Sequence, residues 1–148
     1  LERFFDTIPK DDRYHLEVRT EALLTEAYFE FLEKHRIGQV LSHWTWLAPL
    51  RRQLSRASGR FLNAGKQAVI RLMTPIGMRY EEAYLKAFPF DKMVEGMMSP
   101  RMPEETAEVM LEAIRQNVQA NVIINNRAGG NAPLIAQKVA ERFMQVSK

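Results

Sequence analysis

The chain contains no cysteine among its 148 residues. This absence excludes disulfide bonds, thiolate metal ligands and a cysteine nucleophile, and it fits a reducing cytoplasm. No apolar run is long enough to cross a bilayer, no signal-peptide pattern stands at the start, and there is no initiating methionine. We therefore expect a cytoplasmic protein that does not associate with membranes, and either a natural short chain or a fragment of a longer one.

Acidic side chains are missing from one long segment. No Asp or Glu occurs from Lys34 to Tyr80, whereas nine basic side chains do: Lys34, Arg36, Arg51, Arg52, Arg56, Arg60, Lys66, Arg71 and Arg79. A segment with this charge carries a positive potential and favours an anionic partner such as phosphate or nucleic acid. The alternative is that its basic side chains pair with acidic helices elsewhere in the same chain.

The remaining pattern predicts one α/β domain over residues 1–148. With 46% hydrophobic residues the chain is long enough to bury a core. Short apolar segments predict four strands, at His15–Arg19, Gln39–Ser42, Gln67–Met73 and Ala120–Asn125. Helices are predicted between and after them, at Thr25–His35 with Gly38 ending it, Leu47–Ala57, Tyr80–Ala87, Pro103–Asn117 and Pro133–Val146.

Strands that alternate with helices are usually parallel and joined by right-handed crossovers. Two architectures fit this order: a small open parallel sheet, or half of an eight-stranded barrel. A complete barrel needs about 250 residues, more than this chain has.

Three short blocks resemble the YecE-like family, the domain of unknown function 72. His15-Leu-Glu-Val-Arg19 is similar to the family's Glu-Phe-Arg strand, and Val69-Ile-Arg-Leu72 to its Val-Arg-Leu strand. Ile123-Ile-Asn-Asn126, with Gly130, Ala132 and Ala136 after it, is similar to its Phe-Asn-Asn strand and the next helix. The resemblance implies four parallel strands alternating with helices, as in the C-terminal half of a TIM-like (β/α)8 barrel.

The chain also departs from the family pattern. After the first block the family often has a His and a Ser-Trp, but this chain has Thr20-Glu21-Ala22-Leu23. After the second strand the family often has an Asp, but this chain has Ser42-His43-Trp44. We therefore expect a divergent branch. The family has no settled activity, so the resemblance implies a fold and the position of a site but no reaction. In a half barrel the first and last strands lack neighbours, which predicts self-association or pairing with a missing barrel half.

Polar side chains are expected to meet where the parallel strands end. Residues two apart on a strand point to the same face, so Glu17 and Arg19 share one face of the first predicted strand. Arg71 lies on the third predicted strand. The carboxyl edge should then gather Glu17, Arg19, His43, Arg71, Asn125 and Asn126. Arg19 and Arg71 could bind an anion, Glu17 or His43 could act as a catalytic base, and Asn125 could orient a ligand. The alternatives are a buried ion pair, a packed histidine and asparagines that only cap the turn.

The turn after the last strand, Arg127-Ala-Gly-Gly-Asn131, leads into a helix N-terminus, which favours an anion. Arg127, Gly129 and Gly130 are therefore candidate ligand-binding residues, although the glycines could serve turn geometry alone. The turn has no Gly-Lys-Ser/Thr and is not a nucleotide-binding P-loop. The three histidines, His15, His35 and His43, are dispersed, so we expect no metal site. Whether a cofactor binds is left unknown by the sequence.

Three functions remain open. The first is a binding protein or enzyme for an anionic or phosphorylated small molecule at the carboxyl edge. The second is a nucleic-acid-binding or nuclease-like protein that uses Arg51, Arg52, Arg56 and Arg60. The third is a non-catalytic interaction module that docks a partner through the apolar loop 88–98.

Overall fold

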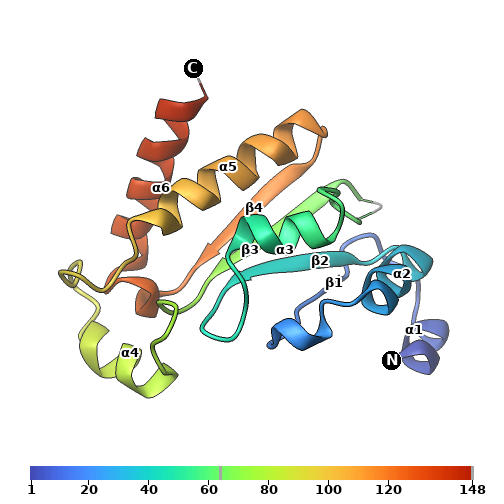
Figure 1. Ribbon diagram of the computed structural model, residues 1–148, viewed down its shortest axis with the longest axis horizontal. Helices are drawn as coiled ribbons and strands as arrows, with labels where there is room; N and C mark the ends of the chain where they lie inside the picture. Colours follow the sequence, from blue (N-terminus) through green and yellow to red (C-terminus); the bar gives the residue numbers. More distant parts are fainter. Residues whose placement is uncertain (64, 148) are drawn as a thin grey trace.

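The computed structural model describes residues 1–63 and 65–147 and contains one four-stranded sheet (Figure 1). All its pairings are parallel, and the strand order follows the sequence, β1-β2-β3-β4. The strands span β1 (His15–Leu16), β2 (Gly38–His43), β3 (Gln67–Leu72) and β4 (Gln119–Ile124). The predicted class of four parallel strands alternating with helices is therefore confirmed.

Helices follow each strand. They are α2 (Glu26–His35), α3 (Leu50–Arg56), α4 (Tyr80–Ala87), α5 (Arg101–Arg115) and α6 (Ala132–Val146), with α1 (Glu2–Thr7) before β1 and short 3-10 turns η1 (Glu21–Leu23) and η2 (Asn126–Ala128). The Thr25 hydroxyl accepts a hydrogen bond from the Tyr28 amide and caps α2 as predicted. Asn131 caps α6 in the same way, by accepting from the Leu134 amide at 3.0 Å.

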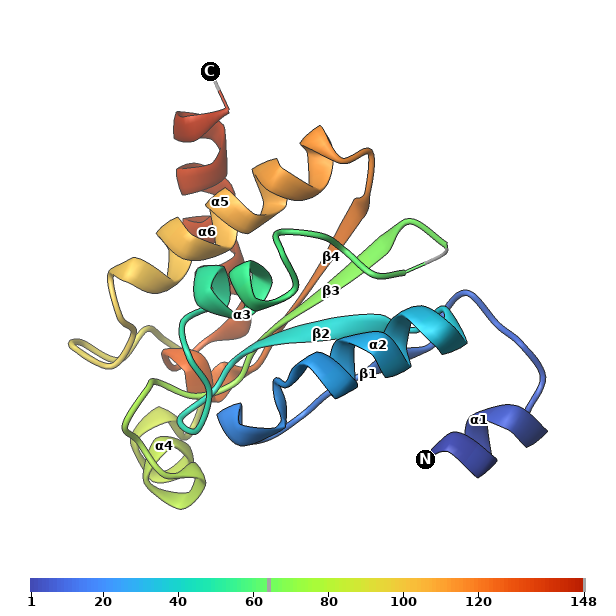
Figure 2. The same ribbon diagram turned by 45° about the vertical axis from the view of Figure 1, so that its right-hand side comes forward.

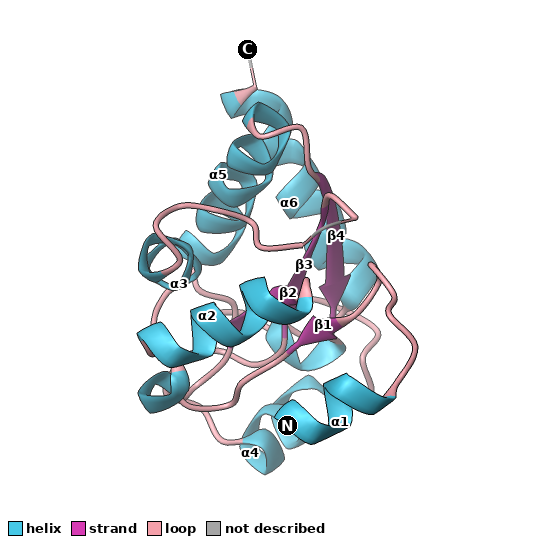
Figure 3. Cartoon of the chain, turned by 90° about the vertical axis from the view of Figure 1, so that its right-hand side faces the viewer, coloured by secondary structure: helices cyan, strands magenta, loops and turns pink. Residues whose placement is uncertain are grey.

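The main core lies between one face of the sheet and helices α3, α5 and α6. Strand residues Leu41, Ile70 and Leu72 pack there against helix residues such as Leu50 and Ile135. On β3 every second residue is buried, because Ala68, Ile70 and Leu72 point towards the helices. Figures 2 and 3 show α2, α3 and α5 on the same side of the strands.

The opposite face of the sheet carries Val40, Ser42, Val69, Arg71, Asn121 and Ile123, which are brought level by the strand register. No helix of the described residues covers β4 on this side (Figure 3), and the side chain of Ile123 is 52% exposed. Parallel sheets are normally covered on both faces. We call this surface, opposite the helices of the main core, the inner face.

Several boundaries differ from the predicted ones. β1 contains only His15–Leu16, because the chain leaves the β2 register before Glu17. Gly38 does not end α2 but begins β2; Arg36 ends the helix in the left-handed conformation. α3 begins only at Leu50, after Pro49. α1, η1 and η2 are too short for a periodic pattern and were not predicted.

No helix within the described residues is both long enough and apolar enough to span a membrane.

Candidate functional site

Glu17 organises a polar cluster on the inner face, at the carboxyl ends of β1, β2 and β3. Its Oε2 atom accepts hydrogen bonds from Arg71 at 2.5 Å and from the Nε atom of Arg19 at 3.0 Å. Its Oε1 atom accepts from the Ser42 hydroxyl at 2.5 Å. The Glu17 side chain is only 14% exposed. We call Glu17, Arg19, Ser42 and Arg71 the arginine cluster.

The arginine cluster carries a net positive charge, since one carboxylate faces two guanidinium groups that stay protonated. Arg71 is 28% exposed and Arg19 53% exposed, so both retain donors that solvent or a ligand can reach. The Arg19 guanidinium also lies over the indole ring of Trp44, 5.0 Å from its centroid. This stacking holds the side chain at the rim of the sheet.

His43 does not join this cluster. It follows Ser42 on β2, and strand alternation directs its ring towards the helices, where it is buried. Its Nδ1 atom is 3.0 Å from the Thr74 carbonyl oxygen, which fixes Nδ1 as the protonated nitrogen. Burial lowers the pKa of His43 below its usual range, although the bond to Thr74 opposes that shift.

A pH dependence of stability follows from this burial. The unfolded chain takes up a proton at His43 near pH 6.5, whereas the folded chain resists it until lower pH. We expect the free energy of unfolding to be fully retained above about pH 6.5 and to fall below it, by up to about 1.4 kcal/mol per pH unit from this group. Urea unfolding between about pH 7.5 and 5 measures the slope. In His43→Asn, which keeps a donor for Thr74, the slope should be smaller; equal slopes would contradict the assignment.

The asparagines after β4 serve the turn itself. The Asn125 Oδ1 atom accepts from the Arg127 amide at 3.0 Å, and the Asn126 Oδ1 atom accepts from the Ala132 amide at 2.8 Å. The amides of Gly129 and Gly130 both donate to the Asn126 carbonyl oxygen. These two glycine amides are therefore engaged within the turn, and the binding roles of Asn125, Asn126, Gly129 and Gly130 stay predictions.

Arg127 is held by α4. Its guanidinium lies 4.0 Å from the centroid of the Tyr80 ring, and its terminal nitrogen donates to the Tyr80 hydroxyl at 3.1 Å. The Nε atom is buried and has no hydrogen-bond partner among the described residues. Two arginines at the carboxyl edge, Arg19 and Arg127, are thus each stacked on an aromatic ring.

Most of the basic segment is matched by acids. Within the described residues, ion pairs join Lys34 to Glu2, Arg36 to Asp12, Arg51 to Glu108, Arg52 and Arg56 to Glu21, and Arg60 to Glu33. These pairs are largely exposed and each contributes little stability. They nevertheless offset the positive potential of the segment that lacks acidic residues. This agrees with the alternative that its basic side chains pair with acidic residues elsewhere in the same chain.

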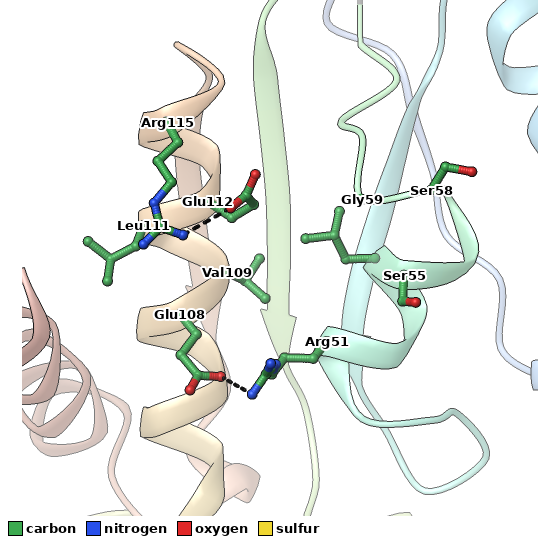
Figure 4. Close-up of a pocket in the computed structure, with 10 residues that line it drawn as sticks. Arg51, Ser55, Ser58, Gly59, Glu108, Val109, Leu111, Glu112 and Arg115 are labelled. Carbon is green, nitrogen blue, oxygen red and sulfur yellow. Dashed lines mark hydrogen bonds and ion pairs between the residues drawn. The ribbon is translucent and has the colours of Figure 1, made fainter.

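A groove of about 640 Å³ lies between α3 and α5, on the side of the molecule away from the inner face (Figure 4). Arg51 and Glu108 pair across it at 3.0 Å, while Glu112 pairs with Arg115 along α5 at 3.1 Å (Figure 4). Charges of both signs neutralise each other there. The groove therefore lacks the unbalanced charge of the arginine cluster.

One group of potential metal ligands lies near the N-terminus. Ligand atoms of Glu2, Asp6 and His35 fall within 4.8 Å of one another. The Glu2 carboxylate, however, already accepts from Lys34 at 2.7 Å and lies 3.1 Å from the His35 ring. An ammonium group in this position competes with a cation, so the geometry gives no reason to place a metal there.

The sequence pattern missed one member of the cluster. Ser42 is fully buried and shares the inner face with Arg71, its register partner on β3. Side chains alternate between the two faces along a strand, so Ser42 could have been placed on the inner face once the pairing of β2 with β3 was known. Glu17, Arg19 and Arg71 do meet at the carboxyl edge in the structure.

The whole chain, residues 1–148, matches the family described as "Protein of unknown function DUF72". The chain belongs to the DUF72 family. It is also similar to the crystal structure of a DUF72 family protein from Thermotoga maritima, with 21% sequence identity and a TM-score of 0.60. No curated protein matches the sequence.

The structural match covers 99% of this chain but 50% of the Thermotoga maritima protein. At this identity the match shows the fold alone. The chain thus has the fold of half of a DUF72 structure, with four parallel strands and their helices, and it spans about half the length of that relative.

Proposed function

We propose that this DUF72 chain binds a phosphorylated or otherwise anionic small molecule at the carboxyl edge of its sheet. The observation that supports this most is the arginine cluster, in which one carboxylate fixes two partly exposed guanidinium groups. A planar guanidinium donates two parallel hydrogen bonds to a phosphate, so preoriented arginines recognise this group well. The net positive charge of the cluster favours the same ligand.

Glu17 is assigned a positioning role. Both of its carboxylate oxygens accept hydrogen bonds from arginine or serine, which leaves it poorly suited to take a proton from a ligand. His43 has no hydrogen bond to the cluster among the described residues. Proton transfer by Glu17 or His43 therefore stays a prediction from the sequence, and the proposal concerns binding.

Replacing Arg71 by Ala should strongly weaken the binding of inorganic phosphate. One charge-assisted hydrogen bond contributes about 1.5–3 kcal/mol, so affinity should fall by about tenfold or more. NMR titration of the arginine Nε–H signals measures it directly. Arg19→Ala, at a more exposed position, should weaken binding while disturbing the fold less.

Arg51→Ala is the matched control, because Arg51 is an exposed, ion-paired arginine on the helix side. It should bind phosphate as the parent chain does. Unchanged affinity in folded Arg71→Ala and Arg19→Ala, or equal losses in Arg51→Ala, would remove the proposal. A steep loss of nucleic-acid binding with salt that depends on Arg51 would instead support the nucleic-acid alternative.

The β4 side of the inner face favours a second function, pairing with another four-stranded unit. The outer edge of β4 has no strand partner among the described residues, and Ile123 on this strand is half-exposed. The chain also matches half of its structural relative. We infer that a second unit covers this face, and in isolation that unit is another copy of the chain.

Sedimentation equilibrium should then show a dimer that weakens strongly in Ile123→Lys, since a buried charge in the interface is costly. Ile114→Lys is the matched control: Ile114 is similarly exposed but lies on α5. A stable monomer at all concentrations, or equal effects of both substitutions, would contradict the pairing.

A further inference from the structure

We propose that the ligand at the carboxyl edge is an aromatic phosphate, whose single flat ring stacks on Trp46 while its phosphate reaches Arg19. This inference rests on the proposed function, because the same arginines bind the anionic end. It adds the chemical class of the ligand and a second subsite.

A cavity of about 250 Å³ lies at the carboxyl edge, between the loop after β2 and the start of α4. Trp44, Trp46 and Tyr80 line it. The two sides are tied together, since the Thr45 hydroxyl donates to the Met78 carbonyl oxygen at 2.6 Å. The two segments that form the cavity are therefore linked directly.

The three aromatic rings of this cavity are not equivalent. Arg19 lies over Trp44 and Arg127 lies over Tyr80, so each of these rings already has a cationic partner. Trp46 is 61% exposed. An indole that lines a cavity and has an open face offers a stacking surface for a flat ring, worth about 1–3 kcal/mol per nucleic-acid base in other proteins.

The arrangement of charge orients such a ligand. Trp44 lies between the two subsites, because it lines the cavity and the Arg19 guanidinium stacks on its ring. Arg19 and Arg71 both donate to the Glu17 carboxylate. Arg79 and Glu81 also line the cavity, and their opposite charges offset each other. The unbalanced positive charge therefore lies on the Arg19 side, beyond Trp44. The volume is below the about 300 Å³ at which pockets for drug-sized ligands begin, so it suits a single ring.

Calorimetric titration compares three probes with the parent chain: inorganic phosphate, phenyl phosphate and cyclohexyl phosphate. Phenyl phosphate should bind at least about fivefold more tightly than the other two, the lower end of the stacking contribution. Trp46→Leu should remove this preference and leave phosphate binding unchanged. In Trp44→Phe, Trp46 is the single tryptophan, and phenyl phosphate should quench its fluorescence.

Phe88→Leu is the matched control, because Phe88 is also 61% exposed but does not line the cavity. It should keep the preference for phenyl phosphate. If phosphate binds but phenyl phosphate binds no more tightly, the aromatic subsite is wrong and the proposed function stands. If cyclohexyl phosphate equals phenyl phosphate, stacking is wrong. If no probe binds, the proposed function falls together with this inference.

Discussion

Glu17→Gln should destabilise the fold by about 3 kcal/mol, because removing one member of a largely buried ion pair leaves its partner's charge uncompensated. Glu17 is 14% exposed and accepts from two guanidinium groups and from Ser42. A neutral amide retains the shape but not the charge, so Arg19 and Arg71 then repel each other across it. Urea unfolding at neutral pH measures the loss.

The matched control is Glu112→Gln, which removes a carboxylate from a more exposed pair with Arg115. Pairs of that kind contribute about 1 kcal/mol or less. A double-mutant cycle with Arg71→Met separates the interaction from general damage: the double variant should be less destabilised than the sum of the single variants, by about 1–3 kcal/mol. Additive losses, or a loss in Glu17→Gln no larger than in Glu112→Gln, would refute the assignment.

The sequence predicted the fold well wherever local signals agree with tertiary packing. α4 has the predicted limits, Tyr80–Ala87, and the four strands occur at the expected places. The short β1 could not be foreseen, because its length depends on where the chain leaves the β2 register, and no local signal marks that point. The left-handed residue that ends α2 is Arg36 and not Gly38, against the usual preference for glycine at this position, and the local sequence does not show this.

The candidate site could be predicted in part for the same reason. Glu17, Arg19 and Arg71 do lie together at one edge, although Glu17 and Arg19 stand just beyond the end of β1 and not on the strand that was predicted for them. Alternation along β2 also separates His43 from this cluster, since His43 directly follows the inner-facing Ser42. Placing Ser42 on the inner face, however, requires the pairing of β2 with β3, two strands that are distant in sequence. The partners of the basic residues lie equally far away, as in the pair of Arg60 with Glu33, and composition cannot reveal them.

Gly130→Ala should be among the most destabilising single substitutions in this chain, by about 3 kcal/mol or more, through overpacking and a left-handed backbone. Gly130 has a φ of 110°, and an added Cβ atom would overlap the Lys92 carbonyl oxygen and lie 2.9 Å from the Val94 amide nitrogen. Both contacts are backbone atoms, which cannot rotate away as a side chain can. The segment 88–100, which contains Lys92 and Val94, would have to move away from the turn that contains Gly130.

Gly59→Ala separates the two causes. Gly59 also has a positive φ, 72°, but no atom lies within 4 Å of an added Cβ there. This control should cost only the backbone strain, about 1–2 kcal/mol. The difference between the two variants, measured by urea unfolding, then reports the close approach of loop 88–100 to Gly130. If both substitutions cost the same, Gly130 serves backbone conformation alone, and the contact of this turn with Lys92 and Val94 is not what requires glycine.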